Sequence, residues 1–259
     1  MYTDNSNDLP DDFKYSVKVI SCEPEIQSNF QRKVYSLLSA QLLITFIFSL
    51  LAQKSATLQL FVVTHRGLWL LSMVVSVVSC IWLSSVPNPN EIEQPEPFSR
   101  ASPPWYYLPS KKAQLFMLLI FTLAESYSIA LVTISYDSDT VLSALLVTLV
   151  IVAGATIFSL SPMFQASMQT ITSMYYWLNW AVWLMIGIGI SSAIFGFRTS
   201  NLIFGWLGSV VFTLYIFIDT QLIFRKCYID DEIKCCMMLY LDIINLFLSI
   251  LRTMSNSDD

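Results

Sequence analysis

Charged side chains are scarce in this sequence. Only 13% of its 259 residues are Asp, Glu, Lys or Arg, whereas a soluble domain has about 25%. Hydrophobic residues make up 55% of the chain. This deficit of charge argues against a water-soluble protein and indicates that much of the surface faces lipid. The net charge of −5 comes mainly from the termini and loops, which gives no reason to expect a nucleic-acid partner.

Histidine and cysteine are too few, or too irregularly spaced, for familiar catalytic and metal sites. The single histidine, His65, falls in a predicted surface loop. The five cysteines show neither the spacing of metal ligands nor the density of a secreted disulfide scaffold. They are Cys22, Cys80, Cys227, Cys235 and Cys236. The last two are adjacent, and we expect them to pack or to carry a lipid near a membrane surface. We expect no enzymatic activity, no catalytic residue and no cofactor.

The N-terminus lacks the features of a cleavable signal peptide. The opening stretch MYTDNSNDLPDDFKYSVKVIS is polar and acidic, without a basic start followed by an apolar core. Residues 1–30 are therefore predicted to be a disordered cytosolic tail. Residues 253–259 are predicted to be a short polar tail at the other end.

Long apolar runs are abundant instead. A helix needs about 20 apolar residues to cross a bilayer. Six stretches meet or approach this length: Val34–Ala52, Gly67–Val86, Ala113–Ile134, Val141–Leu160, Met174–Phe197 and Leu202–Phe224. A seventh, Cys235–Leu251, has about 17 residues, the short limit for a span, so it either crosses or dips in and returns. The sequence predicts an all-α integral membrane domain over residues 31–252, with the proline-rich segment 87–112 as a solvated linker.

The distribution of lysine and arginine predicts the orientation. If all seven segments cross, ten of the fourteen basic residues lie on the side of the N-terminus and four on the opposite side. The ten are Lys14, Lys18, Arg32, Lys33, Arg100, Lys111, Lys112, Arg225, Lys226 and Lys234, and the four are Lys54, Arg66, Arg198 and Arg252. Because basic residues concentrate on the cytosolic side, the N-terminus is predicted to be cytosolic.

Three acidic residues lie inside the predicted spans: Glu125, Asp219 and Asp242. Intramembrane carboxylates are unfavourable and usually mark ion or proton pathways. Measured along the helices from the turn that joins the last two segments, Asp219 lies about 7.5 Å and Asp242 about 10.5 Å deep. The short turn makes these segments antiparallel neighbours. Both carboxyl groups should therefore lie at a similar depth in the cytosolic half.

This aspartate pair predicts a proton-sensitive ion gate. Two carboxylates in a low-dielectric site do not ionise together easily, so Asp219 and Asp242 are expected to share one proton. Acidic pH should close the pair with that proton, whereas higher pH should charge both groups and push them apart. The charged pair should also attract calcium transiently, because calcium prefers carboxylate oxygens. In the other interpretation, each aspartate makes a fixed hydrogen bond to a neighbouring helix.

Glu125 and two groups of small residues carry further expectations. Glu125 lies near the membrane centre and either lines an ion pathway or makes a fixed hydrogen bond to a serine or tyrosine of a neighbouring helix. The small residues of segments 187–196 and 205–208 are predicted to allow close contact between helices.

Several stretches together resemble the Bax inhibitor family, and its lifeguard-like branch in particular. They are FQRKVYSLLSAQLLITF (30–46), FTLAESYSIALVTISYDSDTVLSALLVT (121–148), GWLGSVVFTLYIFIDTQLIF (205–224) and MMLYLDIINLFLSIL (237–251). The pairing of IDTQLI with LYLDIINLF at this separation is specific. The resemblance covers residues 30–252 and is closest to fungal members.

The resemblance implies a bundle of six helices around a short central seventh helix. It implies a pH-sensitive calcium leak across intracellular or bacterial membranes and, in eukaryotes, protection from cell death and a link to endoplasmic-reticulum stress. It further implies that Asp219 and Asp242 are the family's aspartate pair and that Glu125 occupies its acidic position in the third helix. Some members lock the pair with an arginine inside the second helix, and Gly67–Val86 contains none.

The location and partners are also expectations. The resemblance favours the endoplasmic reticulum, with the vacuole or another endomembrane as alternatives. The expected partners are the lipid bilayer, calcium, protons and membrane proteins that regulate cell death.

Three functions stay open at this point. The leading expectation is a passive calcium leak gated by protonation of the aspartate pair. Proton-coupled cation exchange would use the same carboxylates but would require a counter-ion gradient. A non-transporting scaffold that restrains cell-death proteins would not depend on Asp219.

Overall fold

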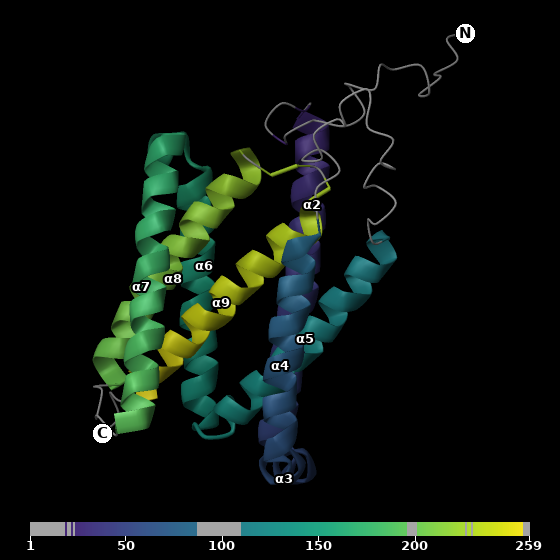
Figure 1. Ribbon diagram of the computed structural model, residues 1–259, viewed down its shortest axis with the longest axis vertical. Coiled ribbons are helices and arrows are strands. Elements are labelled where there is room, and N and C mark those ends of the chain that lie inside the picture. Colours follow the sequence, from purple (N-terminus) through teal and green to yellow (C-terminus); the bar gives the residue numbers. More distant parts are fainter. Residues whose placement is uncertain are drawn as a thin grey trace, which may run out of the picture.

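The computed structural model describes residues 24–86, 110–195, 201–225, 227–228 and 230–255, together with Val19 and Cys22. Their secondary structure is helical, with short connections (Figure 1). The elements in chain order are α2 (Pro24–Lys54), α3 (Ala56–Thr64), α4 (Arg66–Ser85), α5 (Lys111–Thr133), α6 (Ser138–Leu160), the 3₁₀ helix η3 (Pro162–Phe164), α7 (Met168–Phe195), α8 (Asn201–Arg225) and α9 (Glu232–Ser255). Most of the predicted N-terminal tail and of the proline-rich linker lies outside the described residues.

The helices are those of a membrane protein. Within the described residues, six are long and apolar enough to cross a bilayer: α2, α4, α5, α6, α8 and α9. The predicted all-α membrane class is therefore confirmed. The fifth predicted span, Met174–Phe197, falls on α7 as far as Phe195, but α7 is not one of these six. That seven helices cross the membrane remains a prediction.

Two helices are longer than the sequence predicted. α2 begins at Pro24, because proline is well tolerated in the first turn of a helix. Residues 24–30, which the sequence predicts to be part of a disordered tail, are helical in the structure. α9 contains 24 residues, which gives a length of about 36 Å. This corrects the prediction of a short seventh helix: α9 continues past the apolar run at both ends, where hydropathy no longer marks it.

Apolar side chains point outward from most helices. On α4, for example, Leu70, Val74, Val78 and Ile81 are each 58–60% exposed. Exposing such a surface to water would be unfavourable by about 25 cal/mol per Å² of apolar area. A lipid environment removes this penalty, so these side chains are explained by a surrounding bilayer.

α9 lies at the centre of the bundle. Of its apolar window 67% is buried, against 17–39% for the other five candidate spans. It contacts α2, α4, α5, α6 and α8. In Figure 1 it runs obliquely between α2, α4 and α5 on one side and α6, α7 and α8 on the other. A polar side chain in the middle of α9, such as Asp242, is therefore enclosed by protein.

Glycine allows α8 to approach α9 closely. A Cβ atom at Gly205 would lie 2.9 Å from the Ser249 carbonyl oxygen, and one at Gly208 would overlap the Ser249 side chain. The predicted close contact of segment 205–208 is thus confirmed. For segment 187–196 the prediction is wrong at Gly187 and Gly189, which have no described neighbour within 4 Å. Residues 186–190 of α7 are exposed, so Gly187 and Gly189 do not lie at a contact between described helices.

Candidate functional site

Asp219 and Asp242 come together between α8 and α9. Asp219 is 3% exposed and Asp242 is 9% exposed, and a side-chain hydrogen bond joins their carboxyl groups. An ionised carboxylate only accepts hydrogen bonds, so this bond requires a proton on one of the two groups. The two residues therefore have the proximity that the depth argument predicted. Their role as a gate stays a prediction.

Nothing else in the described part of the chain neutralises this aspartate pair. The ion pairs recorded there join Lys111 to Asp230 and Glu232, at the ends of α5 and α9. Asp219 Oδ1 and Asp242 Oδ2 accept no hydrogen bond from any other described group. A shared proton is thus the means by which the site can tolerate two buried carboxyl groups.

Two tyrosine side chains, Tyr175 of α7 and Tyr215 of α8, lie near both aspartates. Their rings meet edge to face, with centroids 5.7 Å apart. Gln221, two residues after Asp219, donates from Nε2 to the Phe164 carbonyl oxygen at 2.9 Å. This bond ties α8 to η3 and fixes the helix segment that carries Asp219.

The site offers oxygen atoms to a cation but no complete metal site. Asp219 Oδ1 and Asp242 Oδ2 are buried acceptors without a donor in the described structure. Among the described residues no cluster of three or more His, Cys, Asp or Glu side chains could hold a metal ion. Calcium takes about six to eight oxygen ligands. Two carboxylates therefore fit transient contact with calcium better than its stable retention.

Glu125 belongs to a different polar cluster. It lies on α5 and accepts a hydrogen bond from the Ser76 hydroxyl of α4. Tyr240 of α9 is also close enough to interact with it electrostatically. No contact with either aspartate is recorded for Glu125 among the described residues. Of the two interpretations of Glu125, the fixed hydrogen bond to a neighbouring serine is the one with a partner in the structure.

α2 is joined to α5 and α9 by a ladder of buried polar residues that our sequence analysis missed. The α2 members recur at every fourth position, which places them on one helix face. The contacts are Gln41 Nε2 to Thr122 Oγ1 (2.7 Å), Thr45 Oγ1 to Ser126 Oγ (3.0 Å) and to Tyr240 Oη (2.8 Å), and Ser49 Oγ to Thr133 Oγ1 (2.6 Å). Polar contacts of this kind hold helices together in lipid. The four-residue spacing was the signal that could have revealed the ladder.

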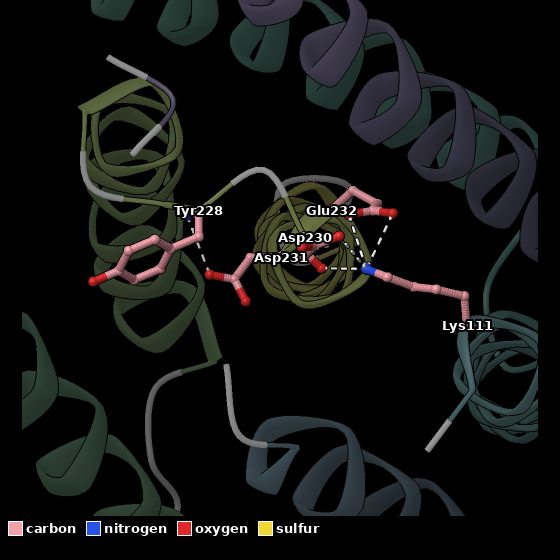
Figure 2. A network of polar contacts seen from close by, with 5 residues as sticks. All are labelled: Lys111, Tyr228, Asp230, Asp231 and Glu232. Carbon is pink, nitrogen blue, oxygen red and sulfur yellow. Dashed lines mark hydrogen bonds and ion pairs between the residues drawn. The ribbon is translucent and has the colours of Figure 1, made fainter. Parts of the chain in front are cut away.

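The turn between α8 and α9 is anchored to α5 (Figure 2). Lys111 Nζ lies 2.5 Å from the Asp230 carbonyl oxygen and 3.3 Å from both carboxylate oxygens of Glu232. Within the turn, the Tyr228 amide donates to Asp231 Oδ2 at 3.3 Å. The side chains of Lys111 and Asp230 are 43% and 56% exposed, so their ion pair is screened by water. Lys111 thus joins the turn to the start of α5 through one backbone carbonyl and two carboxylates.

The second span has its basic residue at its end. α4 begins at Arg66 and contains no other lysine or arginine. The described structure therefore provides no arginine inside this span that could lock the aspartate pair.

Comparison with known proteins places the whole chain among relatives. Residues 27–259 match the family described as "Inhibitor of apoptosis-promoting Bax1". The chain is 52% identical over 267 residues to "Bax inhibitor 1" of Saccharomyces cerevisiae, which covers 97% of this chain and 90% of the yeast protein. It is 29% identical to "Protein lifeguard 4" of Mus musculus, over 94% of this chain and 92% of the mouse protein. It is 26% identical to "Golgi anti-apoptotic protein" of vaccinia virus, over 96% and 94%.

These matches cover α8 and α9, which carry the aspartate pair, as well as the rest of the bundle. They confirm the resemblance found in the sequence. The chain belongs to the Bax inhibitor family.

Proposed function

We propose that this protein is a pH-sensitive calcium leak channel of an intracellular membrane, gated by protonation of Asp219 and Asp242. The observation that carries the proposal is the hydrogen bond between these two buried carboxyl groups. In this proposal the bond keeps a proton between α8 and α9. At low pH the shared proton holds the pair closed. At higher pH the proton leaves, the carboxylates repel each other, and α8 separates from α9 to open a path.

Calcium is the proposed permeant ion. A doubly charged pair attracts a divalent cation, and calcium prefers carboxylate oxygens. The oxygen ligands on α8 and α9 are too few to retain it. Weak and brief binding is what a conducting path requires, since an ion must leave as readily as it enters.

The proposed topology has seven crossings, with α7 as the fifth and the N-terminus in the cytosol. α7 is 28 residues long, or about 42 Å, which exceeds the thickness of a bilayer core. Ten of the fourteen basic residues then lie on the cytosolic side. We propose the endoplasmic reticulum as the resident membrane, or else the vacuole or another endomembrane.

The proposed cellular role is the regulation of cell death through calcium homeostasis and the stress response. The names of two relatives, "Bax inhibitor 1" and "Golgi anti-apoptotic protein", support the part of this role that concerns cell death. Membrane proteins that regulate cell death are the proposed partners. The proposal includes no enzymatic step and no cofactor.

The test is calcium entry into liposomes that contain the purified protein, across a pH series from mildly acidic to mildly basic. Flux through the wild type should rise with pH. Asp219→Asn and Asp242→Asn should each lose this dependence, because a single remaining carboxyl group has no partner with which to share a proton. Asp139→Asn is the matched control, since Asp139 is exposed in the first turn of α6, and it should keep the wild-type pH profile.

The outcomes separate the three candidate functions. A flux that stops when the counter-ion gradient is removed would favour proton-coupled exchange over a leak. A flux no greater than that of empty liposomes at every pH would reject transport and favour a scaffold. An unchanged pH profile in both aspartate variants would reject the pair as the gate.

A further inference from the structure

Two thiols meet at the turn between α8 and α9. Cys235 Sγ donates a hydrogen bond to Cys227 Sγ at 3.0 Å, and neither cysteine is in a disulfide. Cys235 is buried, whereas Cys227 is half-buried. In the sequence, Cys235 is adjacent to Cys236, whereas Cys227 lies eight residues away. In the structure, Cys236 points elsewhere, with its Sγ donating to Gln41 Oε1 at 2.8 Å.

The backbone around both thiols is held in place. The Cys227 amide donates to the Leu222 carbonyl oxygen at 3.3 Å, and the Cys227 carbonyl accepts from the Val19 amide at 3.0 Å. The Cys235 amide donates to the Asp231 carbonyl oxygen at 2.9 Å, at the first turn of α9. The contact between the sulfur atoms therefore joins two fixed points, one after α8 and one at the start of α9.

We infer that Cys227 and Cys235 form a reversible disulfide that acts as a redox clamp between α8 and α9. A disulfide bond is about 2.0 Å long, so the two sulfur atoms need to approach by about 1 Å, a movement within the range of side-chain rotation. A metal ion is a poorer explanation for the pair. Zinc takes about four ligands, and the described residues contain no cluster of three or more metal-binding side chains.

Hydrogen peroxide can serve as the oxidant that converts the two thiols into the disulfide. The Cys227 sulfur, which is the more exposed of the two, attacks one peroxide oxygen; the O–O bond breaks, and Cys227 becomes a sulfenic acid with release of one water. The Cys235 sulfur then attacks the Cys227 sulfur. The S–S bond forms, the S–O bond breaks, and the hydroxyl group leaves as a second water with the Cys235 proton. The two thiols lose two electrons, and a dithiol reductant restores them by exchange.

The effect of this bond on conduction rests on the proposed function. Asp219 lies roughly two helical turns before Cys227, and Asp242 roughly two turns after Cys235. Opening of the gate requires α8 and α9 to separate at the aspartate pair. A covalent bond across their shared turn restrains that separation, so the oxidised protein should conduct less. In the proposed topology the turn faces the cytosol, where thiols are kept reduced, so the clamp closes only under oxidising conditions.

The bond itself is tested on the full-length protein by mass spectrometry. Treatment with hydrogen peroxide, followed by alkylation of the free thiols, should leave three of the five cysteines alkylated, with residues 227 and 235 in one linked peptide. Dithiothreitol should restore all five. Cys236→Ser is the matched control and should still lose two thiols, whereas Cys227→Ser should lose none.

Two results would overturn the bond: five alkylated cysteines after peroxide treatment of the wild type, or a linked peptide that joins Cys235 to Cys236 or to a second molecule. Because this measurement is made on the wild type, it stands even if a cysteine variant fails to fold.

Conduction is then compared in liposomes at one pH. Peroxide should slow calcium entry about fivefold or more, as expected for coupling between two sites, and dithiothreitol should restore it. The Cys227→Ser variant should show no response to peroxide. Equal flux in the oxidised and reduced wild type would overturn the clamp. Absence of flux in both forms would overturn the proposed function and the clamp on conduction together, while the mass measurement still decides the bond.

Discussion

At the scale of single residues, buried carboxyl groups are tolerated here in two different ways. Asp219 and Asp242 satisfy each other through a hydrogen bond, which works only while one of them keeps a proton. Glu125 instead accepts a hydrogen bond from Ser76, and a hydroxyl donor serves a carboxylate in either protonation state. The first arrangement requires a shared proton, whereas the second does not.

The role of Glu125 is tested by removing its donor. Ser76→Ala should lower the free energy of unfolding by about 0.5–1.5 kcal/mol, because the half-buried Glu125 carboxyl group loses its hydrogen-bond donor. The measurement is thermal unfolding of the purified protein in detergent. Ser85→Ala is the control, because Ser85 lies at the exposed end of the same helix. The pH profile of calcium flux should not change, since the aspartate pair lies on other helices. A normal melting temperature with altered flux would instead assign Glu125 to the ion pathway.

At the scale of helices, α8 and α9 are fastened at both ends with the aspartate pair between them. At one end, Gly205 and Gly208 allow α8 to pack directly on α9. At the other end, the turn is anchored by Lys111 and contains the contact between Cys227 and Cys235. Repulsion between the aspartates therefore acts on a helix pair whose ends are restrained. Changes at either end should influence how far the pair opens.

Substitution by alanine at two glycines should change the stability of the protein in opposite directions. Gly205→Ala should destabilise the protein by about 1–3 kcal/mol, because the added Cβ meets the backbone of α9 and forces a shift. Gly189→Ala should stabilise it by about 0.5–1 kcal/mol, because this helical position has open space and alanine favours the helix. Melting temperatures in one detergent provide the comparison. Stabilisation by Gly205→Ala would contradict the packing described for this end.

At the scale of the whole molecule, the helix bundle is apolar outside as well as inside. Apolar side chains cover the outside of α4 and other helices and also form most of the buried core. The buried polar side chains gather in a few places, among them the ladder on α2 and the aspartate pair. The central helix, α9, meets both groups: Tyr240 contacts Thr45 of the ladder, and Asp242 contacts Asp219. A movement of α9 would therefore alter the contacts of both the ladder and the aspartate pair.

The topology of the whole chain is tested with tags at both ends. With seven crossings, a tag at the N-terminus should be cleaved by protease added to sealed vesicles that keep their cytosolic face outward, and a tag at the C-terminus should be protected. The reason is the excess of basic residues on the N-terminal side. Vesicles opened with detergent are the control and should lose both tags. Protection of the N-terminal tag would reverse the orientation, and cleavage of both tags in sealed vesicles would indicate an even number of crossings.

The sequence by itself determined the membrane class and the approximate depth of the two aspartates. Apolar length decides whether a helix suits a bilayer, and the fixed rise of a helix converts sequence position into depth. Because the turn 226–231 is short, α8 and α9 must be antiparallel neighbours. The similar depth predicted for Asp219 and Asp242 follows from these constraints, but the rotation that turns their side chains toward each other does not.

Only the tertiary structure decided which face of each helix meets which neighbour. Rotation of a helix about its axis is set by the packing of the whole bundle, and in nearly uniform apolar segments the sequence carries little periodic signal to report it. For this reason the sequence did not separate inward Gly205 from outward Gly189, did not choose Ser76 as the partner of Glu125, and did not pair Cys227 with Cys235. The charged ends of α9 likewise became helical through contacts that hydropathy does not record.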